Sequence, residues 1–421
     1  MLSNEAKQTL KSQLKAFGDQ VQRLSPNHRE EARKLFKKLK LDGAIRALTP
    51  LEYCAQPILE LASCSFPEYE PIYAVDGGST RIQRLENGTT LCAFQAVLSS
   101  DPDTRCKGLP LEAFRSLSLI SHSQRTDLGG AKAERFTNDE YIHAWRVHIS
   151  RTYLEHEIER VVGGLARMAA ESCHVLRMLE VIKPQQGLFI LDGNLYPIGL
   201  YYYLAGEEQH WAEENGTQMS WTEWGSAVEI LAQPMRVVEA FSARGLALVG
   251  LNKNPSTSWL LEFTLDRASH NWSSDAQFIR AVLSDTPKDS LGYTHWFVQE
   301  GYSLPQRREQ DIKSFDIFEH LRSLGLVHPP RAYDVCFFYV YDPRVKAVLK
   351  VEAPRTVFEK HDPERLRAQI LAEIAQGKGV PPAIRRADSR ARITEEESTA
   401  LIRACGIELD LSYNQSRGEF I

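Results

Sequence analysis

Apolar residues at helical spacing dominate the first part of the chain. Leu10, Leu14 and Phe17 fall three or four positions apart, and Val21 and Leu24 continue the stripe. Such spacing is typical of one face of an amphipathic helix. A second run follows the interruption at Pro26 and carries Leu35, Leu39 and Ile45. The pattern predicts helices up to about Leu51, with apolar faces that pack against the rest of the chain or a partner.

The pattern changes to that of strands at Pro71. The apolar run 72–75 ends in Asp76-Gly77, and a second β-rich run covers 89–99. The turn dipeptide Asn87-Gly88 lies between them, which predicts an antiparallel hairpin. The polar segment 99–137 has room for one more strand.

Helices and strands then alternate. A helical pattern over 139–181 precedes the buried-type strand 188–191, and a helix over 221–244 precedes the strand 246–251. This order predicts an α/β fold with parallel crossovers in a mixed sheet flanked by helices.

The last third begins with a second hairpin, predicted over 335–340 and 345–352, and continues as helices from His361. The stretch 255–330, which lies between the two parts that contain hairpins, mixes helical and strand patterns. We therefore expect an N-terminal helical segment over 1–68, a first part of the core over 69–254, an insertion over 255–330, and a C-terminal hairpin with helices over 331–421.

Composition narrows the class of protein. The 421 residues are 43% hydrophobic and 25% charged, with a net charge of −5, so neither a disordered chain nor a generally basic nucleic-acid binder is expected. The seven cysteines form no C-x-x-C pair, as in a reduced cytosolic protein. No apolar stretch is long enough for a membrane helix. We expect a soluble, cytoplasmic protein with no membrane partner.

Two Asp-Gly pairs carry the strongest chemical signal. Asp76 and Asp192 each follow a short apolar strand, and the carboxyl ends of such strands meet where ligands bind in open α/β sheets. Neighbouring carboxylates repel unless a cation lies between them, and oxygen ligands favour Mg²⁺ or Mn²⁺. The alternative is that Asp-Gly is a common turn dipeptide.

A third carboxylate for such a site is sought on the helix over 139–181. Glu155 follows Arg151 by one helical turn and is the preferred choice, with Glu159 and Glu171 as rivals. The alternative for most of these acids is a solvated face with i, i+4 ion pairs.

Positive residues elsewhere could hold phosphates. Lys253 follows the strand 246–251, where an ammonium group could meet a phosphate. The segment 378–393 contains one acid, Asp388, and five positive residues: Lys378, Arg385, Arg386, Arg390 and Arg392. The alternative is an ordinary charged surface helix. No nucleotide-binding P-loop, G-x-S-x-G elbow or H-E-x-x-H motif is present.

Taken in order, these motifs resemble the NurA family of nucleases over about residues 70–393. The resemblance rests on five short stretches: 74–79 (AVDGGS), 191–195 (LDGNL), 250–253 (GLNK), 351–354 (VEAP), and 379–381 (GVP) through Ala387-Asp388. It implies an RNase H-like core, Mn²⁺- or Mg²⁺-dependent cleavage of DNA, and a homodimer that docks on a HerA-type hexameric ATPase.

The resemblance also assigns roles. Asp76 and Asp192 would hold the metals, with Glu155 as third ligand and Glu171 as its rival. Lys253 and the four arginines Arg385, Arg386, Arg390 and Arg392 are expected to hold the DNA backbone. The chain departs from the family in having Asp-Gly-Gly-Ser in the first motif, and Asp388 where the family has histidine.

The leading hypothesis is thus a metal-dependent DNA nuclease with Asp76, Asp192, Glu155, Asp388 and Lys253 in its active site. It would act in DNA end processing, repair or defence against foreign DNA. Asp388 and the acidic net charge motivate an alternative, a catalytically weak RNase H-like adaptor that binds and regulates an ATPase ring. A nuclease acting on RNA is a third hypothesis.

Overall fold

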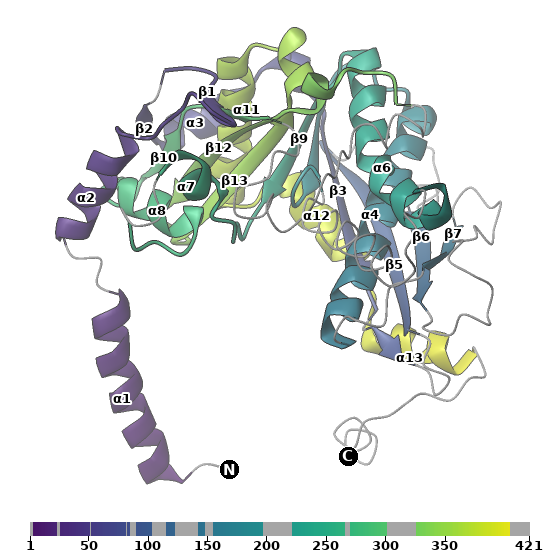
Figure 1. Ribbon diagram of the computed structural model, residues 1–421, viewed down its shortest axis with the longest axis horizontal. Helices are drawn as coiled ribbons and strands as arrows, with labels where there is room; N and C mark the ends of the chain where they lie inside the picture. The colour runs from purple at the N-terminus through teal and green to yellow at the C-terminus, as the bar shows by residue number, and fades with distance from the viewer. Residues whose placement is uncertain are drawn as a thin grey trace, which may run out of the picture.

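A computed structural model describes residues 3–22, 26–50, 52–80, 82–84, 90–102, 115–122, 142–147, 155–196, 221–265, 270–300 and 326–404. One thirteen-stranded sheet runs across this part of the protein (Figure 1). Its main path has the order β1-β11-β12-β13-β9-β8-β3-β5-β6-β7, while β2, β4 and β10 pair beside it. The chain is therefore a mixed α/β protein built on a large sheet flanked by helices.

The strands of this sheet are β1 (Ile45–Ala47), β2 (Tyr53–Pro57), β3 (Ile72–Ser79), β4 (Gln83–Arg84), β5 (Thr90–Asp101), β6 (Arg115–His122), β7 (Ile142–Val147), β8 (Leu188–Asp192), β9 (Ala247–Asn252), β10 (Ser290–Thr294), β11 (Phe297–Gln299), β12 (Val335–Asp342) and β13 (Ala347–Pro354).

The α-helices are α1 (Asn4–Gln22), α2 (Pro26–Phe36), α3 (Ile58–Ser63), α4 (Glu155–Ile182), α6 (Trp221–Arg244), α7 (Trp259–Thr264), α8 (Asp275–Val282), α11 (Pro363–Gly377), α12 (Pro382–Ala391) and α13 (Glu395–Ala404). Short 3₁₀ turns occupy Pro67–Tyr69, Pro330–Tyr333 and Arg355–Glu359.

The centre of the sheet confirms the predicted alternation of strands and helices. β3 pairs antiparallel with β5, as predicted for the first hairpin, and parallel with β8. β8 in turn pairs parallel with β9, after a crossover that contains α6. Residues 72–75 are all buried, which explains their continuous apolar pattern, since a central strand is covered on both faces.

The second predicted hairpin is also confirmed, as β12 paired with β13. β13 joins the centre of the sheet by antiparallel pairing with β9. The segment expected as an insertion contributes β10 and β11, which both pair with β12. Within the described residues, this segment thus extends the same sheet and forms no separate layer.

Two local predictions were wrong. Ile45 was placed on a helix but lies in β1, which pairs with β11, so contact with a distant strand overrides the helical spacing. Residues 142–147 were placed in the long helix but form β7, parallel to β6. This stretch, Ile-His-Ala-Trp-Arg-Val, is rich in the β-branched and aromatic residues that favour strands, and α4 begins only at Glu155.

Different helices cover the two faces of the sheet. On β5, Ser99 Oγ donates to the Ala383 carbonyl of α12 at 2.5 Å, which assigns α12 to the face of odd-numbered β5 residues. The opposite face carries α4, where Ser116 of β6 lies 2.8 Å from His174 Nδ1. α6 shares that face, since Phe241 packs edge-on against Phe189 of β8 at 4.9 Å.

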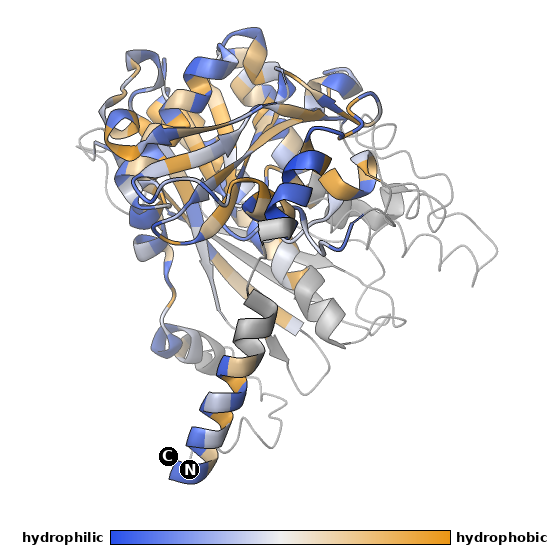
Figure 2. Cartoon of the chain, turned by 90° about the vertical axis from the view of Figure 1, so that its left-hand side faces the viewer, coloured by the Kyte–Doolittle hydropathy of each residue, from blue (hydrophilic) through white to orange (hydrophobic). Residues whose placement is uncertain are grey.

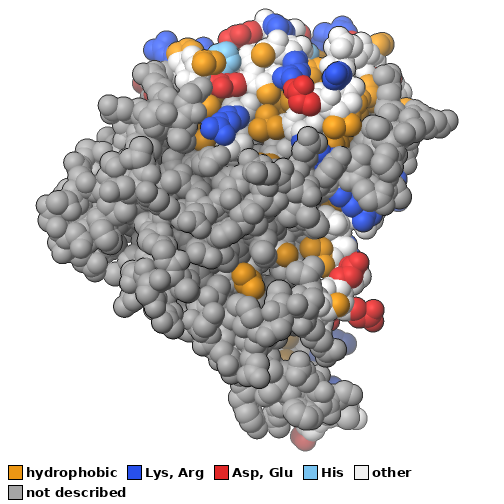
Figure 3. Space-filling model, turned by 90° about the vertical axis from the view of Figure 1, so that its right-hand side faces the viewer, with side chains coloured by type: hydrophobic (Ala, Val, Ile, Leu, Met, Phe, Trp, Pro, Cys, Tyr) orange, Lys and Arg blue, Asp and Glu red, His pale blue; other side chains and the backbone are white. Residues whose placement is uncertain are grey.

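The apolar core follows the sheet. Figure 2 shows hydrophobic residues concentrated on the strands of the main body and hydrophilic residues on its outer helices. On the described part of the face shown in Figure 3, positive and negative side chains are mixed, in keeping with the near balance of charges in the sequence. No helix among the described residues is long and apolar enough to cross a membrane.

Glu373 of α11 is a buried carboxylate away from the strand ends. It is 5% exposed, Oε1 accepts from Gln369 Nε2 at 3.1 Å, and Oε2 has no partner among the described residues. Burial, and then the nearby charges of Asp101 and Glu70, raise the pKa of Glu373 to about 7. Because the folded state holds this proton more tightly than the unfolded state, stability falls as pH rises toward that value.

We predict that Glu373→Gln removes this loss of stability at higher pH. At about pH 8 the variant should be more stable than the wild type by up to about 3 kcal/mol, and at about pH 5 the two should be similar. Urea unfolding at both pH values measures the difference. Glu60→Gln, at an exposed acid on α3, is the control and should change stability at neither pH. An equal effect of Glu373→Gln at both values would contradict the prediction.

Candidate functional site

Two aspartates lie where the parallel pairing of β3 with β8 ends. Asp76 follows Val75 in β3 and Asp192 is the last residue of β8. The register pairs Val75 with Leu191, so the two aspartates are neighbours at the same edge of the sheet. Asp76 is 3% exposed and the Asp192 side chain 11% exposed. The parallel pairing thus brings together two carboxylates that are far apart in sequence.

The alternation of side chains along β3 sets the direction of Asp76. Gly78 points to the same face of the sheet, and a Cβ placed on it would lie 2.2 Å from the Ala391 carbonyl oxygen of α12. Asp76 therefore points to the face that α12 covers. A side chain at position 78 would push the end of α12 away, which explains the second glycine of the Asp-Gly-Gly-Ser motif.

A third carboxylate, Glu171 of α4, lies near enough for its charge to raise the pKa of Asp76. Arg167 lies one helical turn earlier, and its Nε is 2.9 Å from Glu171 Oε1. The same guanidinium donates to the Asp192 main-chain carbonyl oxygen. Arg167 thus connects the helix to the end of β8 and partly balances the charge of the acids.

The turn after β8 requires glycine at position 193. Gly193 has φ of +118°, a conformation that side chains disfavour, and a Cβ there would lie 2.8 Å from Arg167 Nη2. The Asp192-Gly193 dipeptide therefore forms the turn and leaves room for the Arg167 guanidinium.

Burial and like charges shift the pKa values of the cluster. Burial, and then the charges of Asp192 and Glu171, raise the pKa of Asp76 to about 8. Burial raises the pKa of Glu171 to about 7, although the nearby Arg167 opposes this. The pKa of Arg167 is raised mainly by Glu171. Burial thus favours the protonated forms of Asp76 and Glu171, and the neighbouring acidic charges add to this effect.

Each aspartate has one oxygen with a partner and one without. Asp76 Oδ1 accepts from the Gly77 N–H at 2.7 Å, and Asp192 Oδ2 pairs with Lys253 Nζ at 2.7 Å. Asp76 Oδ2 and Asp192 Oδ1 are buried and have no hydrogen-bond partner among the described residues. Since buried polar atoms are normally satisfied, two unpaired carboxylate oxygens on adjacent strands fit a cation.

A buried ion pair on β13 contacts the loop that follows β8. Glu352 Oε2 accepts from the Leu195 N–H at 2.9 Å, and Oε1 pairs with Lys350 Nζ at 2.8 Å. Glu352 therefore holds the loop after β8, and both of its oxygens have partners.

Glu171 and Glu155 lie far apart on α4. Glu155 is the first residue of α4, and Glu171 lies sixteen residues further on, about 24 Å at ~1.5 Å per residue. A helix of that length cannot bring both to the strand ends. The choice of Glu155 as third ligand therefore stays a prediction. Glu159 lies about 18 Å from Glu171 by the same rule, and the side chains of Glu155 and Glu159 are outside those described.

Only some of the charged side chains of the segment 378–393 are exposed. Arg385 and Arg392 are exposed, and so is Asp388, which makes no hydrogen bond or ion pair within the described residues. Arg386 is not free as expected, because it donates to the Ser100 carbonyl at 2.6 Å and pairs with Asp101 at 2.9 Å. Arg390 is half-buried, and its carbonyl accepts from Gln95 at 3.2 Å.

Sequence patterns did not single out Arg167 as a site residue. Its only signal there is its spacing of four residues from Glu171, which on a surface helix indicates an ordinary ion pair. The pair is in fact at the strand ends, and its contact with Asp192 depends on folding.

The fold and the site together define a mixed α/β protein with a buried acidic cluster suited to a divalent cation. A family model for the NurA domain matches residues 70–393, most of the chain. The chain therefore belongs to the NurA family.

Solved structures give further matches. The NurA nuclease from Sulfolobus solfataricus is 10% identical, with 93% of this chain and 96% of that chain covered and a TM-score of 0.41. A NurA bound to dAMP and manganese is 13% identical, with 96% and 98% covered and a TM-score of 0.42. A NurA with manganese is also 13% identical, with 95% and 98% covered and a TM-score of 0.43. No curated protein matches the chain in sequence.

We predict that Gly78→Ala weakens the packing of α12 on β3. The added methyl group would contact the Ala391 carbonyl, so we expect a loss of about 1–3 kcal/mol in the free energy of unfolding. Chemical denaturation measures this. Gly43→Ala is the matched control, because a Cβ at Gly43 meets nothing within 4 Å. Equal stability of the two variants would show that α12 does not rest on Gly78.

Proposed function

We propose that this chain is a divalent-cation-dependent nuclease that hydrolyses phosphodiester bonds in DNA. The observation that carries the proposal is the pair Asp76 and Asp192, on adjacent parallel strands, each with a buried oxygen that has no partner among the residues that the structure describes. Membership of the NurA family supports the same chemistry.

Asp76 and Asp192 would hold the cation, with Glu171 as the third acid. Their donor atoms are all oxygen, which suits Mn²⁺ or Mg²⁺. When bound, such ions polarise a phosphoryl oxygen and lower the pKa of a bound water. Arg167 fixes the position of Glu171 and of the β8 terminus through its two contacts.

Lys253 would bind the phosphate of the substrate. Its ammonium now pairs with Asp192, and its side chain is 31% exposed, so it lies between the acids and solvent. Arg385 and Arg392 are exposed on and next to α12 and would contact the DNA backbone. In the proposal Asp388 stays the counterpart of the family histidine, as a carboxylate without a partner within the described residues.

The proposal includes a homodimer and a HerA-type ATPase as partners, in DNA end processing, repair or anti-phage defence. The family and the N-terminal helix support it. On α1, Leu10 and Leu14 are 53% and 61% exposed and lie one helical turn apart. An apolar stripe of this kind fits a helix that packs on another protein chain.

We predict that Asp76→Asn and Asp192→Asn each lower nuclease activity by about 100-fold or more, because a loss of several kcal/mol of cation-dependent stabilisation corresponds to that factor. The assay uses single- and double-stranded DNA and RNA of the same sequence, with Mn²⁺, with Mg²⁺ and with a chelator. Wild type should cut DNA only with a metal ion.

Asp285→Asn is the control, because Asp285 is a surface acid that pairs with Arg33. It should retain full activity. Asp76→Asn should be at least as stable as wild type, since it removes one of several buried like charges. Equal activity of all variants would refute the site, preferential cutting of RNA would refute the DNA assignment, and an inactive wild type would favour the ATPase-binding adaptor.

A further inference from the structure

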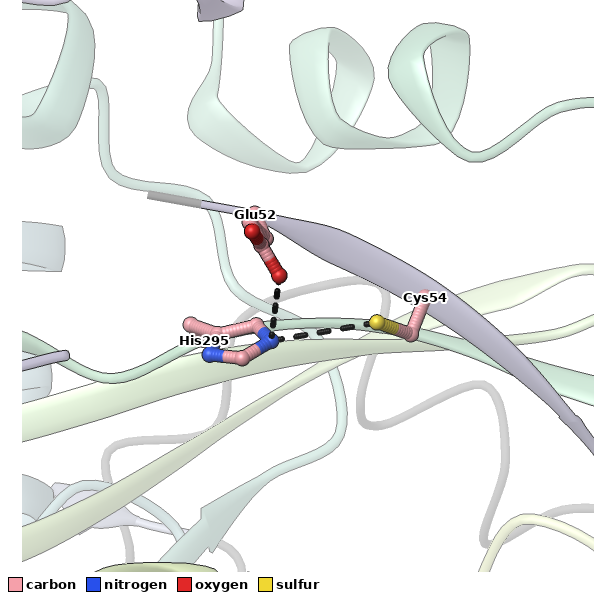
Figure 4. A group of neighbouring side chains, drawn as sticks. All are labelled: Glu52, Cys54 and His295. Atoms are coloured by element: carbon pink, nitrogen blue, oxygen red, sulfur yellow. Dashed lines mark hydrogen bonds and ion pairs between the residues drawn. The ribbon is translucent and has the colours of Figure 1, made fainter. Parts of the chain in front are cut away.

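Three side chains capable of binding a metal meet far from the acidic cluster (Figure 4). Cys54 lies on β2 with Glu52 just before that strand, and His295 follows β10. One ligand atom from each lies within 4.8 Å of the others. β2 pairs antiparallel with β10, with Tyr53 opposite Thr294, and the His295 N–H donates to the Glu52 carbonyl at 3.0 Å. The backbone pairing therefore fixes which side chains meet.

The Cys54 thiol and His295 Nε2 are within reach of a long hydrogen bond, whereas the distance from His295 to Glu52 exceeds that of a hydrogen bond. His295 Nε2 is 3.8 Å from Glu52 Oε2 and 3.8 Å from Cys54 Sγ. A nitrogen–oxygen hydrogen bond is ~2.7–3.2 Å long. Tetrahedral zinc, with bonds of ~2.0–2.3 Å, separates its ligand atoms by roughly 3.4–3.6 Å. Small rotations of the Glu52 and Cys54 side chains would close the remaining differences.

The imidazole is oriented for ligation. His295 Nδ1 lies 3.3 Å from Thr49 Oγ1, and when Nδ1 donates this hydrogen bond the lone pair is on Nε2, which faces Cys54 and Glu52. Burial lowers the pKa of His295, and the charge of Arg367 acts in the same direction. The His295 side chain is 16% exposed, so one side of the cluster is dry while Glu52 reaches solvent.

The charges around the cluster tolerate a divalent cation. Arg367 is the nearby positive group, but it pairs with Glu364 and lies over the Tyr293 ring at 5.0 Å. A thiolate and a carboxylate would neutralise a doubly charged ion. Burial raises the pKa of the Cys54 thiol. Ligation of a metal ion by a thiol releases its proton.

We propose that Cys54, His295 and Glu52 form a second metal site, for Zn²⁺ or a chemically similar ion, with water as the fourth ligand. Its sulfur and nitrogen donors distinguish it from the all-oxygen cluster of Asp76, Asp192 and Glu171. The bound ion would tie β2, which pairs only with β10 within the described residues, to the rest of the sheet. This site is independent of the proposed nuclease activity.

The test uses the full chain, stripped of metal with a chelator and titrated with Co²⁺. A cysteine ligand gives a thiolate-to-cobalt charge-transfer band, which oxygen ligands do not give. We expect the band in wild type, and its loss in Cys54→Ser. Cys64→Ser is the matched control, because Cys64 is a free cysteine of similar exposure that only donates to the Glu60 carbonyl. It should retain the band, as should Asp192→Asn.

A second measurement guards against variants that misfold. Glu52→Gln changes an exposed side chain, and we expect it to weaken Zn²⁺ binding at least as much as the ~10–100-fold cost of altering a supporting residue. Zn²⁺ should raise the melting temperature of stripped wild type and leave that of Cys54→Ser unchanged. Absence of the band in wild type, its persistence in Cys54→Ser, or its loss in Cys64→Ser would overturn the proposal.

Discussion

Repulsion between the carboxylates of Asp76 and Asp192 is the constraint around which this sheet is arranged. The parallel pairing of β3 with β8 makes them neighbours, and burial deprives them of the water that would screen their charges. Arg167 and Lys253 approach from two different elements, yet in the described part of the chain two carboxylate oxygens have no partner. Such an arrangement costs stability in the absence of a cation and gains it when one binds.

The surrounding structure holds these groups in place. Gly78 allows α12 to lie directly on β3, and Gly193 allows the Arg167 guanidinium to approach the turn after β8. The buried pair of Lys350 and Glu352 fixes the loop after β8 from the side of β13. The second half of the sheet is therefore part of the support for the site, including the strands of the segment 255–300 that pair with β12.

The sequence predicts much of this fold because its central strands carry local signals. Residues 72–75 and 188–191 are continuous apolar runs that end in Asp-Gly, and both are strands with aspartates at the same edge. The sequence could not select Glu171, because every acid on a long helix has the same spacing pattern, and the choice depends on which turn reaches the strand ends. It also missed β7, where pairing with β6 decided the structure.

Contacts between distant residues were beyond sequence reasoning altogether. Cys54 and His295 are 241 residues apart, and neither has a neighbour in sequence with metal-ligand spacing except Glu52. Only the pairing of β2 with β10 brings them together. In the same way, the role of Arg386 became clear only when β5 placed Asp101 beside it.

The most direct test of the cation site is a crystal structure with Mn²⁺, with the ion located by anomalous scattering. We predict an anomalous peak shared by Asp76 Oδ2 and Asp192 Oδ1, with Lys253 Nζ moved away from Asp192. Anomalous density elsewhere, with the Lys253–Asp192 pair intact and both oxygens still unbound, would contradict this prediction.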